Sequence, residues 1–421
     1  MELADPLIAR PATLSGGRWT AHPGLLGLIT VLGPVSMDLY LPGLPEVSQS
    51  LGLGREAASA TLFACLAGLA AGQVLWGQVI DRHGNRRPLL LAIALWVLAS
   101  GGCALATDGT MLIALRAMQG LAGGCGMTVA RTVLAQRLTG HLLAAGLARI
   151  ALVTNVCAVS APLVGGVLLG ASGWRGLFLV LAGCGIAVAL LAALAFRESV
   201  APRRDRTGSL RPRDLLVPLR SASYTRAAVV AVVSFAQVIL YVSIAPAMLR
   251  GHYGLGGAAF GAVFAVTVAA LIAGTRLAPL LLRRFPSRRD PLVATCLMAA
   301  AVALLQAGAA AADAWPPLVV TVALFAFGNV VSGLLISLGA TEALSAATAG
   351  AGVAAGLLGG LQFGGGAVLA TLATATGVRT LGGYGLAGAL ACLLSAGLAA
   401  RAGRTPDAPR TTRFPARDSP A

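Results

Sequence analysis

Two ionisable residues, Asp38 and Arg116, interrupt long apolar runs in which charges are otherwise rare. Charged side chains inside such runs are costly in a membrane, so each one is a functional hypothesis by default. Each lies about five residues from the same end of its run, and at about 1.5 Å per residue the two reach nearly the same depth. They could share one cavity, where a carboxylate can take up and release a proton, or form an ion pair that only fixes helix packing. We predict proton coupling at Asp38 and Arg116, because moving the arginine away or bringing in a substrate would change the proton occupancy of the carboxylate.

Uncharged polar residues inside the apolar runs form a second group of candidates. Gln237 and Tyr241 are four residues apart, so they share one face of a helix. Gln119 lies one turn from Arg116. Such groups could hydrogen-bond a substrate, or each could bond only to a neighbouring helix. The predicted substrate-binding residues are Asp38, Tyr40, Arg116, Gln119, Gln237, Tyr241, Asn329 and Gln362.

Membrane helices are the elements that must position these residues. Of the 421 residues, 57% are hydrophobic and 11% are charged, and the mean hydropathy is +0.83. Soluble domains carry about 25% charged residues, so this chain cannot cover a water-facing surface. A helix of about 20 apolar residues crosses about 30 Å of hydrocarbon. Twelve runs qualify: 24–43, 57–79, 88–106, 111–130, 150–171, 176–195, 227–249, 258–282, 291–311, 317–340, 352–376 and 381–400.

A polar stretch rich in Arg and Pro, 197–226, divides these runs into six and six. The halves echo each other, because Arg86-Arg87-Pro88-Leu89-Leu90 precedes the third run and Arg288-Arg289-Asp290-Pro291-Leu292 precedes the ninth. We therefore predict an all-α polytopic membrane protein with a six-helix half at 24–196 and another at 227–400, joined by a linker. The segment 1–23 and a disordered tail, 401–421, complete the chain.

The charge distribution predicts the orientation. All 31 basic residues are arginines, against 15 acidic residues, for a formal net charge of +16. With the N-terminus inside, 25 arginines fall in cytoplasmic segments, four in outer segments and two in spans. Membrane proteins retain positive charge on the cytoplasmic side, so we predict that both termini are cytoplasmic. The same rule accounts for the charge without a nucleic-acid partner.

Cysteine and histidine indicate neither a metal site nor a catalytic one. The seven cysteines all lie in apolar runs without a CxxC pair, and the four histidines are scattered in loops. We predict no disulfide, no metal and no cofactor. We also find no set of catalytic residues in the sequence, so we do not expect an enzyme.

Residues 77–88, G-Q-V-I-D-R-H-G-N-R-R-P, resemble the loop between the second and third spans of the major facilitator superfamily. Asn85 stands where the family usually has a basic residue. The resemblance implies a latch that closes the two halves on the cytoplasmic side, formed by Gly77, Asp81, Arg82, Gly84, Arg86 and Arg87. Residues 116–120, R-A-M-Q-G, resemble a signature whose arginine the family assigns to proton coupling, here Arg116. Arg131, at the inner end of that span, is a further gating candidate.

Three further segments narrow the resemblance to drug:proton antiporters. Residues 161–166, A-P-L-V-G-G, resemble the antiporter motif of the fifth span, which implies export and a gating role for Pro162, Gly165 and Gly166. Residues 36–45 and 354–363 resemble the first and eleventh spans of the Bcr/CflA group of bicyclomycin and chloramphenicol exporters. The resemblance implies a proton-coupled exporter of an antibiotic-like compound in the bacterial cytoplasmic membrane, and a monomer is the default expectation. A proton-coupled uptake symporter or a dedicated metabolite exporter is the alternative.

Overall fold

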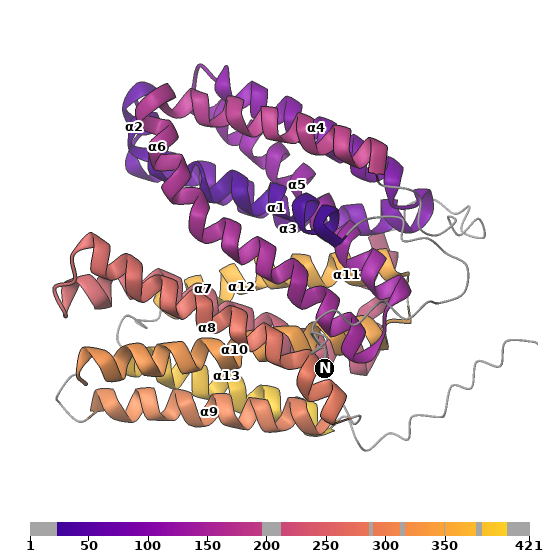
Figure 1. Ribbon diagram of the computed structural model, residues 1–421, viewed down its shortest axis with the longest axis vertical. Coiled ribbons are helices and arrows are strands. Elements are labelled where there is room, and N and C mark those ends of the chain that lie inside the picture. The colour runs from indigo at the N-terminus through magenta and orange to yellow at the C-terminus, as the bar shows by residue number, and fades with distance from the viewer. Residues whose placement is uncertain are drawn as a thin grey trace, which may run out of the picture.

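The computed structural model describes residues 23–195, 212–285, 289–311, 316–348, 350–375 and 381–401. All the regular elements in these ranges are helices (Figure 1). The N-terminal segment, most of the predicted linker and the predicted disordered tail lie outside these ranges. The domain limits proposed from the sequence therefore stay predictions.

The first half of the chain forms six long helical rods from seven elements. These are α1 (Pro23–Asp38), η1 (Leu41–Gly43), α2 (Leu44–Ser50), α3 (Arg55–His83), α4 (Arg86–Ala104), α5 (Gly109–Arg137) and α6 (Gly140–Ala195). The 56-residue α6 contains two of the predicted spans, separated at Gly173, whose φ is 64°. Glycine adopts this left-handed conformation without a steric penalty, so the chain turns there between the fifth and sixth spans.

The second half follows the same plan. It comprises η2 (Pro212–Arg220), α7 (Ala222–Gly251), α8 (Gly257–Arg284), α9 (Arg289–Ala311), α10 (Leu318–Ala346), α11 (Ala351–Gly360), η3 (Leu361–Gly365), α12 (Gly366–Ala375) and α13 (Leu381–Arg401). The span predicted at 352–376 is one rod in which a π-helical turn, η3, separates α11 from α12. η2 and the first turn of α7 lie within the predicted linker, 197–226.

Two pairs of helices make the largest contacts between the halves, and smaller contacts join α5 to α11 and α6 to α10. Figure 1 shows the first half, indigo to magenta, above the second, orange to yellow. α3 packs against α11, and α6 packs against α8. Within each half, glycines let helices touch: a Cβ on Gly120 of α5 would meet the backbone of α3 at Cys65, and a Cβ on Gly333 of α10 would meet α8 at Leu271. Small residues serve this purpose in lipid.

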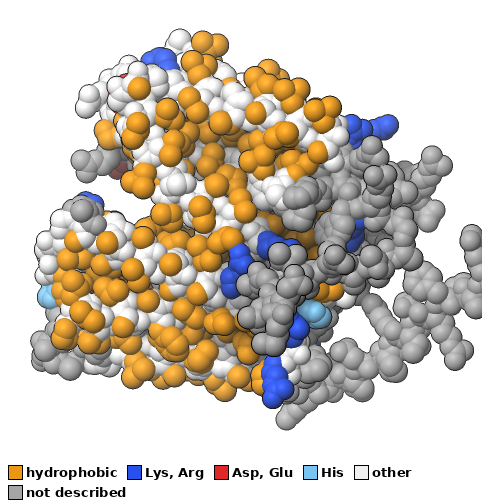
Figure 2. All heavy atoms as spheres, viewed as in Figure 1, with side chains coloured by type: hydrophobic (Ala, Val, Ile, Leu, Met, Phe, Trp, Pro, Cys, Tyr) orange, Lys and Arg blue, Asp and Glu red, His pale blue; other side chains and the backbone are white. Residues whose placement is uncertain are grey.

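The outer surface is apolar. Figure 2 shows hydrophobic side chains spread over both halves. Leu194 and Val319, for example, are 82% and 78% exposed. Of the helices in the described part of the chain, eight segments are long and apolar enough to cross a membrane, with α6 counted once. An exposed apolar surface of this extent suits contact with acyl chains rather than water.

Candidate functional site

Direct hydrogen bonds join the two halves at one end of the seam between them. Asp81, in the last turn of α3, accepts hydrogen bonds from two backbone amides of α11: Gly352 N–H donates to Oδ1 at 2.8 Å, and Val353 N–H donates to Oδ2 at 2.9 Å. The first amides of a helix lack intrahelical partners and carry partial positive charge. Asp81 therefore caps α11 from the other half of the molecule.

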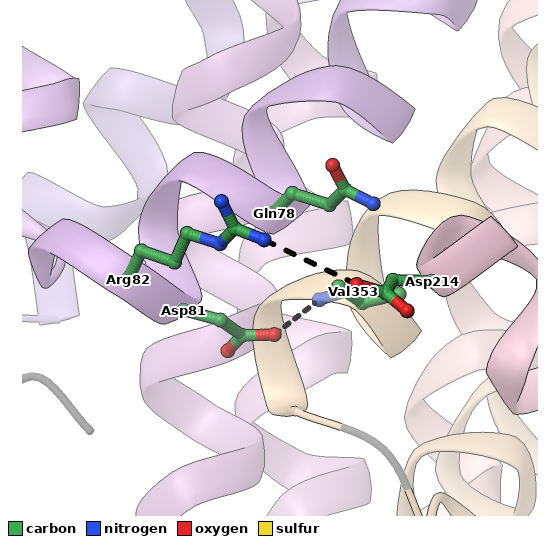
Figure 3. A pocket seen from close by; sticks show the side chains of 5 residues that line it. All are labelled: Gln78, Asp81, Arg82, Asp214 and Val353. Atoms are coloured by element: carbon green, nitrogen blue, oxygen red, sulfur yellow. Dashed lines mark hydrogen bonds and ion pairs between the residues drawn. The ribbon is translucent and has the colours of Figure 1, made fainter. Parts of the chain in front are cut away.

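Arg82 and the linker complete this end of the seam. The Arg82 guanidinium Nη2 lies 4.0 Å from Asp214 Oδ2 of η2. Gln78, Asp81 and Arg82 from α3 line a small recess with Val353 of α11 and Asp214 (Figure 3). We call the contacts of Asp81 and Arg82 across the seam the latch.

Glycines allow the two backbones to meet beside the latch. A Cβ on Gly77 of α3 would lie 2.5 Å from the carbonyl oxygen of Gly352, which is too close for any substituent. One turn further along α11, a Cβ on Gly356 would collide with the carbonyl oxygen of Gln73. This seam tolerates only hydrogen at these positions as long as the latch is closed.

The other predicted gating residues do not all lie at the seam. Arg131 does: its Nη1 donates to Gln73 Oε1 at 3.4 Å, and a Cβ on Gly359 of α11 would lie 2.5 Å from that nitrogen. Gly84 ends α3 with a φ of 80°. Arg86 Nη2 instead donates to the Ala193 carbonyl oxygen of its own half at 2.8 Å.

Arg87 is exposed at the start of α4. The motif in α6 also stays within the first half: a Cβ on Gly165 would collide with the carbonyl oxygen of Leu39, whereas Gly166 faces outward with nothing within 4 Å. Pro162, at intermediate exposure, lies one turn before Gly166. The predicted gating set therefore divides into residues of the latch seam and residues that shape the first half.

Arg116 is fully buried, and the end of α1 holds it. Its Nη1 donates to the Ser36 carbonyl oxygen at 3.0 Å and also contacts Gln119 Oε1. α1 ends at Asp38, so Ser36 lies in the last turn, where carbonyl oxygens lack intrahelical partners and attract a cation. The guanidinium carbon lies 4.8 Å from the centroid of the Tyr40 ring.

Hydrogen bonds extend outward from Arg116. Gln119 Nε2 donates to Ser100 Oγ at 2.7 Å. The Tyr40 hydroxyl, under the guanidinium, shares a 3.0 Å hydrogen bond with Thr61 Oγ1. Within the part of the chain that the structure describes, Nε and Nη2 of Arg116 are buried without a hydrogen-bond partner. The side chain thus retains donors that a ligand or a moved carboxylate can use.

Asp38 is the last residue of α1 and is partly buried. Among the described residues, its carboxylate forms no ion pair with Arg116, which bonds to the Ser36 backbone instead. The ion pair between Asp38 and Arg116 that the sequence analysis considered is therefore not formed in this state.

The second half holds a similar tyrosine without the charge. The Tyr241 hydroxyl shares a 2.9 Å hydrogen bond with Thr267 Oγ1, as Tyr40 does with Thr61. The centroid of the Phe325 ring, rather than a guanidinium, lies 4.9 Å from that of Tyr241. Phe264 stacks on the Tyr241 ring at 6.3 Å.

The remaining polar candidates lie on separate helices. Gln237 is hydrogen-bonded to the side chain of Tyr384 on α13. Asn329 Nδ2 donates to the Phe325 carbonyl oxygen of its own helix at 3.0 Å. Gln362 is buried in the π-helical turn η3. The structure thus brings Tyr40, Arg116 and Gln119 together, while Gln237, Tyr241 and Asn329 form their hydrogen bonds within the second half.

Sequence reasoning missed Thr61, Thr267, Phe325 and Asp214. The hydrogen-bonded Tyr and Thr are 21 residues apart in the first half and 26 in the second, so no common spacing reveals them. Asp214 is one of three acids in the polar linker 197–226, and nothing in the sequence sets it apart from the other two.

The model of the Major Facilitator Superfamily matches residues 26–371. The chain belongs to this superfamily. It is therefore a multi-pass membrane transporter, and the predicted all-α fold of two six-helix halves is confirmed.

Two relatives illustrate the similarity. The chain is 31% identical over 255 residues to the uncharacterized MFS-type transporter YdgK of Bacillus subtilis (strain 168), a match that covers 60% of this chain and 63% of YdgK. It is 28% identical over 354 residues to the multidrug resistance protein MdtL of Escherichia coli O17:K52:H18 (strain UMN026 / ExPEC), covering 83% of this chain and 87% of MdtL.

Solved structures share the fold at low sequence identity. The proton:xylose symporter XylE aligns with a TM-score of 0.68 and 14% identity, over 88% of this chain and 94% of XylE. The human organic anion transporter MFSD10 aligns with a TM-score of 0.67 and 16% identity, over 90% of this chain and 97% of MFSD10. At these identities the likeness concerns the fold alone.

Proposed function

We propose that the chain exports a small antibiotic-like compound across the bacterial cytoplasmic membrane in exchange for protons, as a monomer of the Bcr/CflA type. Export is supported by the match to a protein named for multidrug resistance, which spans 83% of this chain. The A-P-L-V-G-G segment, with Gly165 packed on the backbone beside Asp38, supports the same direction.

Alternating access is supported by one observation above all: Asp81 joins the two halves through two backbone amides at one end of the seam. The latch lies at the right in Figure 1, where α11 begins, and Figure 2 shows a notch between the halves at the opposite, left edge. One end is thus closed by specific contacts while the other is hollowed. The proposed cycle breaks the latch and closes the notch.

The proposed proton site is Asp38, with Arg116 as its electrostatic neighbour. In the cycle, Asp38 takes up a proton when the cavity faces outward, and substrate binding from the inside favours its release. A ligand drives such a switch only if it binds the two states unequally. The unpaired Nε and Nη2 donors of Arg116 allow such a difference in binding, because they can pair with ionised Asp38 in one state and with the substrate in the other.

The test is drug susceptibility in a bacterial host that lacks its own efflux pumps. The wild type is compared with Asp38→Asn at equal membrane levels, using amphenicols, bicyclomycin, macrolides and cationic dyes. Glu56→Gln, which removes an exposed acid of α3, is the matched control. We expect resistance that Asp38→Asn and an uncoupler abolish and that Glu56→Gln retains.

Equal resistance in the wild type and Asp38→Asn would contradict proton coupling through Asp38. Absence of resistance to every compound, with the protein well expressed, would contradict export of this class of substrate. Counterflow measured in membrane vesicles of known orientation then decides between uptake and export of a dedicated metabolite.

A further inference from the structure

The linker between the two halves reaches the latch through η2. Asp214 Oδ2 lies 4.0 Å from Arg82 Nη2, and Figure 3 shows the two side chains facing each other across the recess. Asp214 also lines that recess beside Val353, at the start of α11. The Asp214 side chain is 42% exposed and that of Arg82 is 18% exposed, so water and salt partly screen the pair.

η2 is fixed to the second half. It packs mainly against α7 and α11 and makes a smaller contact with α3. Directly after it, the Ser221 hydroxyl donates to the Ala346 carbonyl oxygen of α10 at 3.4 Å, and the Tyr224 hydroxyl donates to the Ala354 carbonyl oxygen of α11 at 2.7 Å. Arg82, by contrast, belongs to α3 in the first half. The pair of Arg82 and Asp214 therefore crosses the seam, and it must separate when the latch opens.

The charges around the start of α11 explain why an acid at position 214 would stabilise the latch. Both carboxylate oxygens of Asp81 already accept amide hydrogens of α11. The Arg82 guanidinium stands near the positive end of that helix, and like charges repel there. Asp214 adds a negative charge that faces Arg82 and lies next to the N-terminus of α11.

We propose that Asp214 is a third latch residue: from the linker, it stabilises the closed latch by pairing with Arg82. It is a positioning residue, which acts on the balance between the closed and open latch and needs no substrate. The linker thereby takes part in gating in addition to tethering the two halves. The proposal rests on the proposed function only in so far as the latch opens and closes.

Hydrogen exchange measures the latch directly. The amides of Gly352 and Val353 lie in the first turn of α11, where no intrahelical acceptor is available, so their protection depends on Asp81. We would measure their exchange in the full chain, without substrate, in nanodiscs of phosphatidylethanolamine and phosphatidylglycerol. For Asp214→Asn we expect exchange about two- to fivefold faster than in the wild type, the range for partly exposed ion pairs.

Three comparisons separate an ion pair from a general loss of structure. Glu56→Gln removes an acid from the other end of α3 and should leave the rate unchanged. The double variant Arg82→Asp/Asp214→Arg, in which the two charges are swapped, should show slower amide hydrogen exchange than Arg82→Asp alone. Raising the salt from about 0.05 to about 0.5 M should shrink the difference between the wild type and Asp214→Asn, because screening weakens an exposed pair.

A wild-type rate of amide hydrogen exchange in Asp214→Asn would overturn the proposal. So would a double variant with swapped charges whose amides exchange as fast as those of Arg82→Asp alone. Because no substrate is present, these results do not depend on the susceptibility test. If the wild type gives no resistance but the amides of Asp214→Asn exchange faster, only the export proposal is refuted. Resistance with unchanged exchange would refute only the role of Asp214.

Discussion

Replacing Gly77 by alanine should open the latch without touching a hydrogen-bonding group. The added Cβ would lie 2.5 Å from the Gly352 carbonyl oxygen, 3.0 Å from its carbonyl carbon and 3.1 Å from Val353 Cα. All three atoms belong to the backbone of α11, so no side chain can swing away. The clash is relieved only if α3 and α11 move apart, and these helices belong to different halves.

The size of the effect follows from the cost of overpacking, about 1–3 kcal/mol. Alanine also favours a helix over glycine by up to about 1 kcal/mol, but α3 is helical whether the latch is open or closed, so this gain cancels. The ratio of open to closed latch should therefore rise by about five- to 150-fold, at tenfold per 1.4 kcal/mol.

Exchange of the Gly352 and Val353 amides is again the assay, because both lose their Asp81 acceptor when the helices part. Gly101→Ala on α4 is the matched control, since an added Cβ there meets nothing within 4 Å. Protection equal to the wild type in Gly77→Ala, with Gly101→Ala also unchanged, would refute the claim that backbone contact at Gly77 holds the latch closed.

Three further substitutions test other contacts. Asp81→Ala removes two hydrogen bonds to a charged group, each of about 1.5–3 kcal/mol, so first-turn exchange in α11 should rise more than in any Asp214 variant. Tyr40→Phe loses the bond to Thr61 but keeps the ring under Arg116; it should lower stability by about 0.5–1.5 kcal/mol, seen as a lower thermal midpoint in detergent, and an unchanged midpoint would contradict the bond. Gly165→Ala forces a Cβ against the Leu39 carbonyl oxygen next to Asp38, so resistance should fall while Gly166→Ala, which faces open space, retains it.

Hydropathy predicted the rods because crossing a bilayer demands length and apolarity, which a sequence displays directly. It even placed a gap between 171 and 176, where Gly173 turns the chain. Hydropathy did not predict that α1 ends at Asp38, because the apolar run continues to 43. That early end exposes the Ser36 carbonyl oxygen, which Arg116 takes in preference to the Asp38 carboxylate.

The latch illustrates the same division between local and long-range information. Resemblance to a family loop singled out Asp81 and Arg82, since a motif is a local pattern. Their partners are not local: Gly352 is 271 residues from Asp81, and it contributes a backbone amide, which no residue type signals. No sequence pattern signals Asp214 either, because the packing of η2 on α7, α11 and α3 brings it to Arg82.

The two halves use one scaffold for different purposes. Each places a tyrosine hydroxyl on a threonine of the next long helix, at 3.0 Å in the first half and 2.9 Å in the second. Above the tyrosine ring, the first half puts Arg116 at 4.8 Å and the second puts Phe325 at 4.9 Å. A buried guanidinium needs acceptors, and the early end of α1 provides one in Ser36. The second half has an aromatic ring there instead, so in the proposed cycle the charge that responds to protons lies in one half and moves relative to an apolar aromatic cluster in the other.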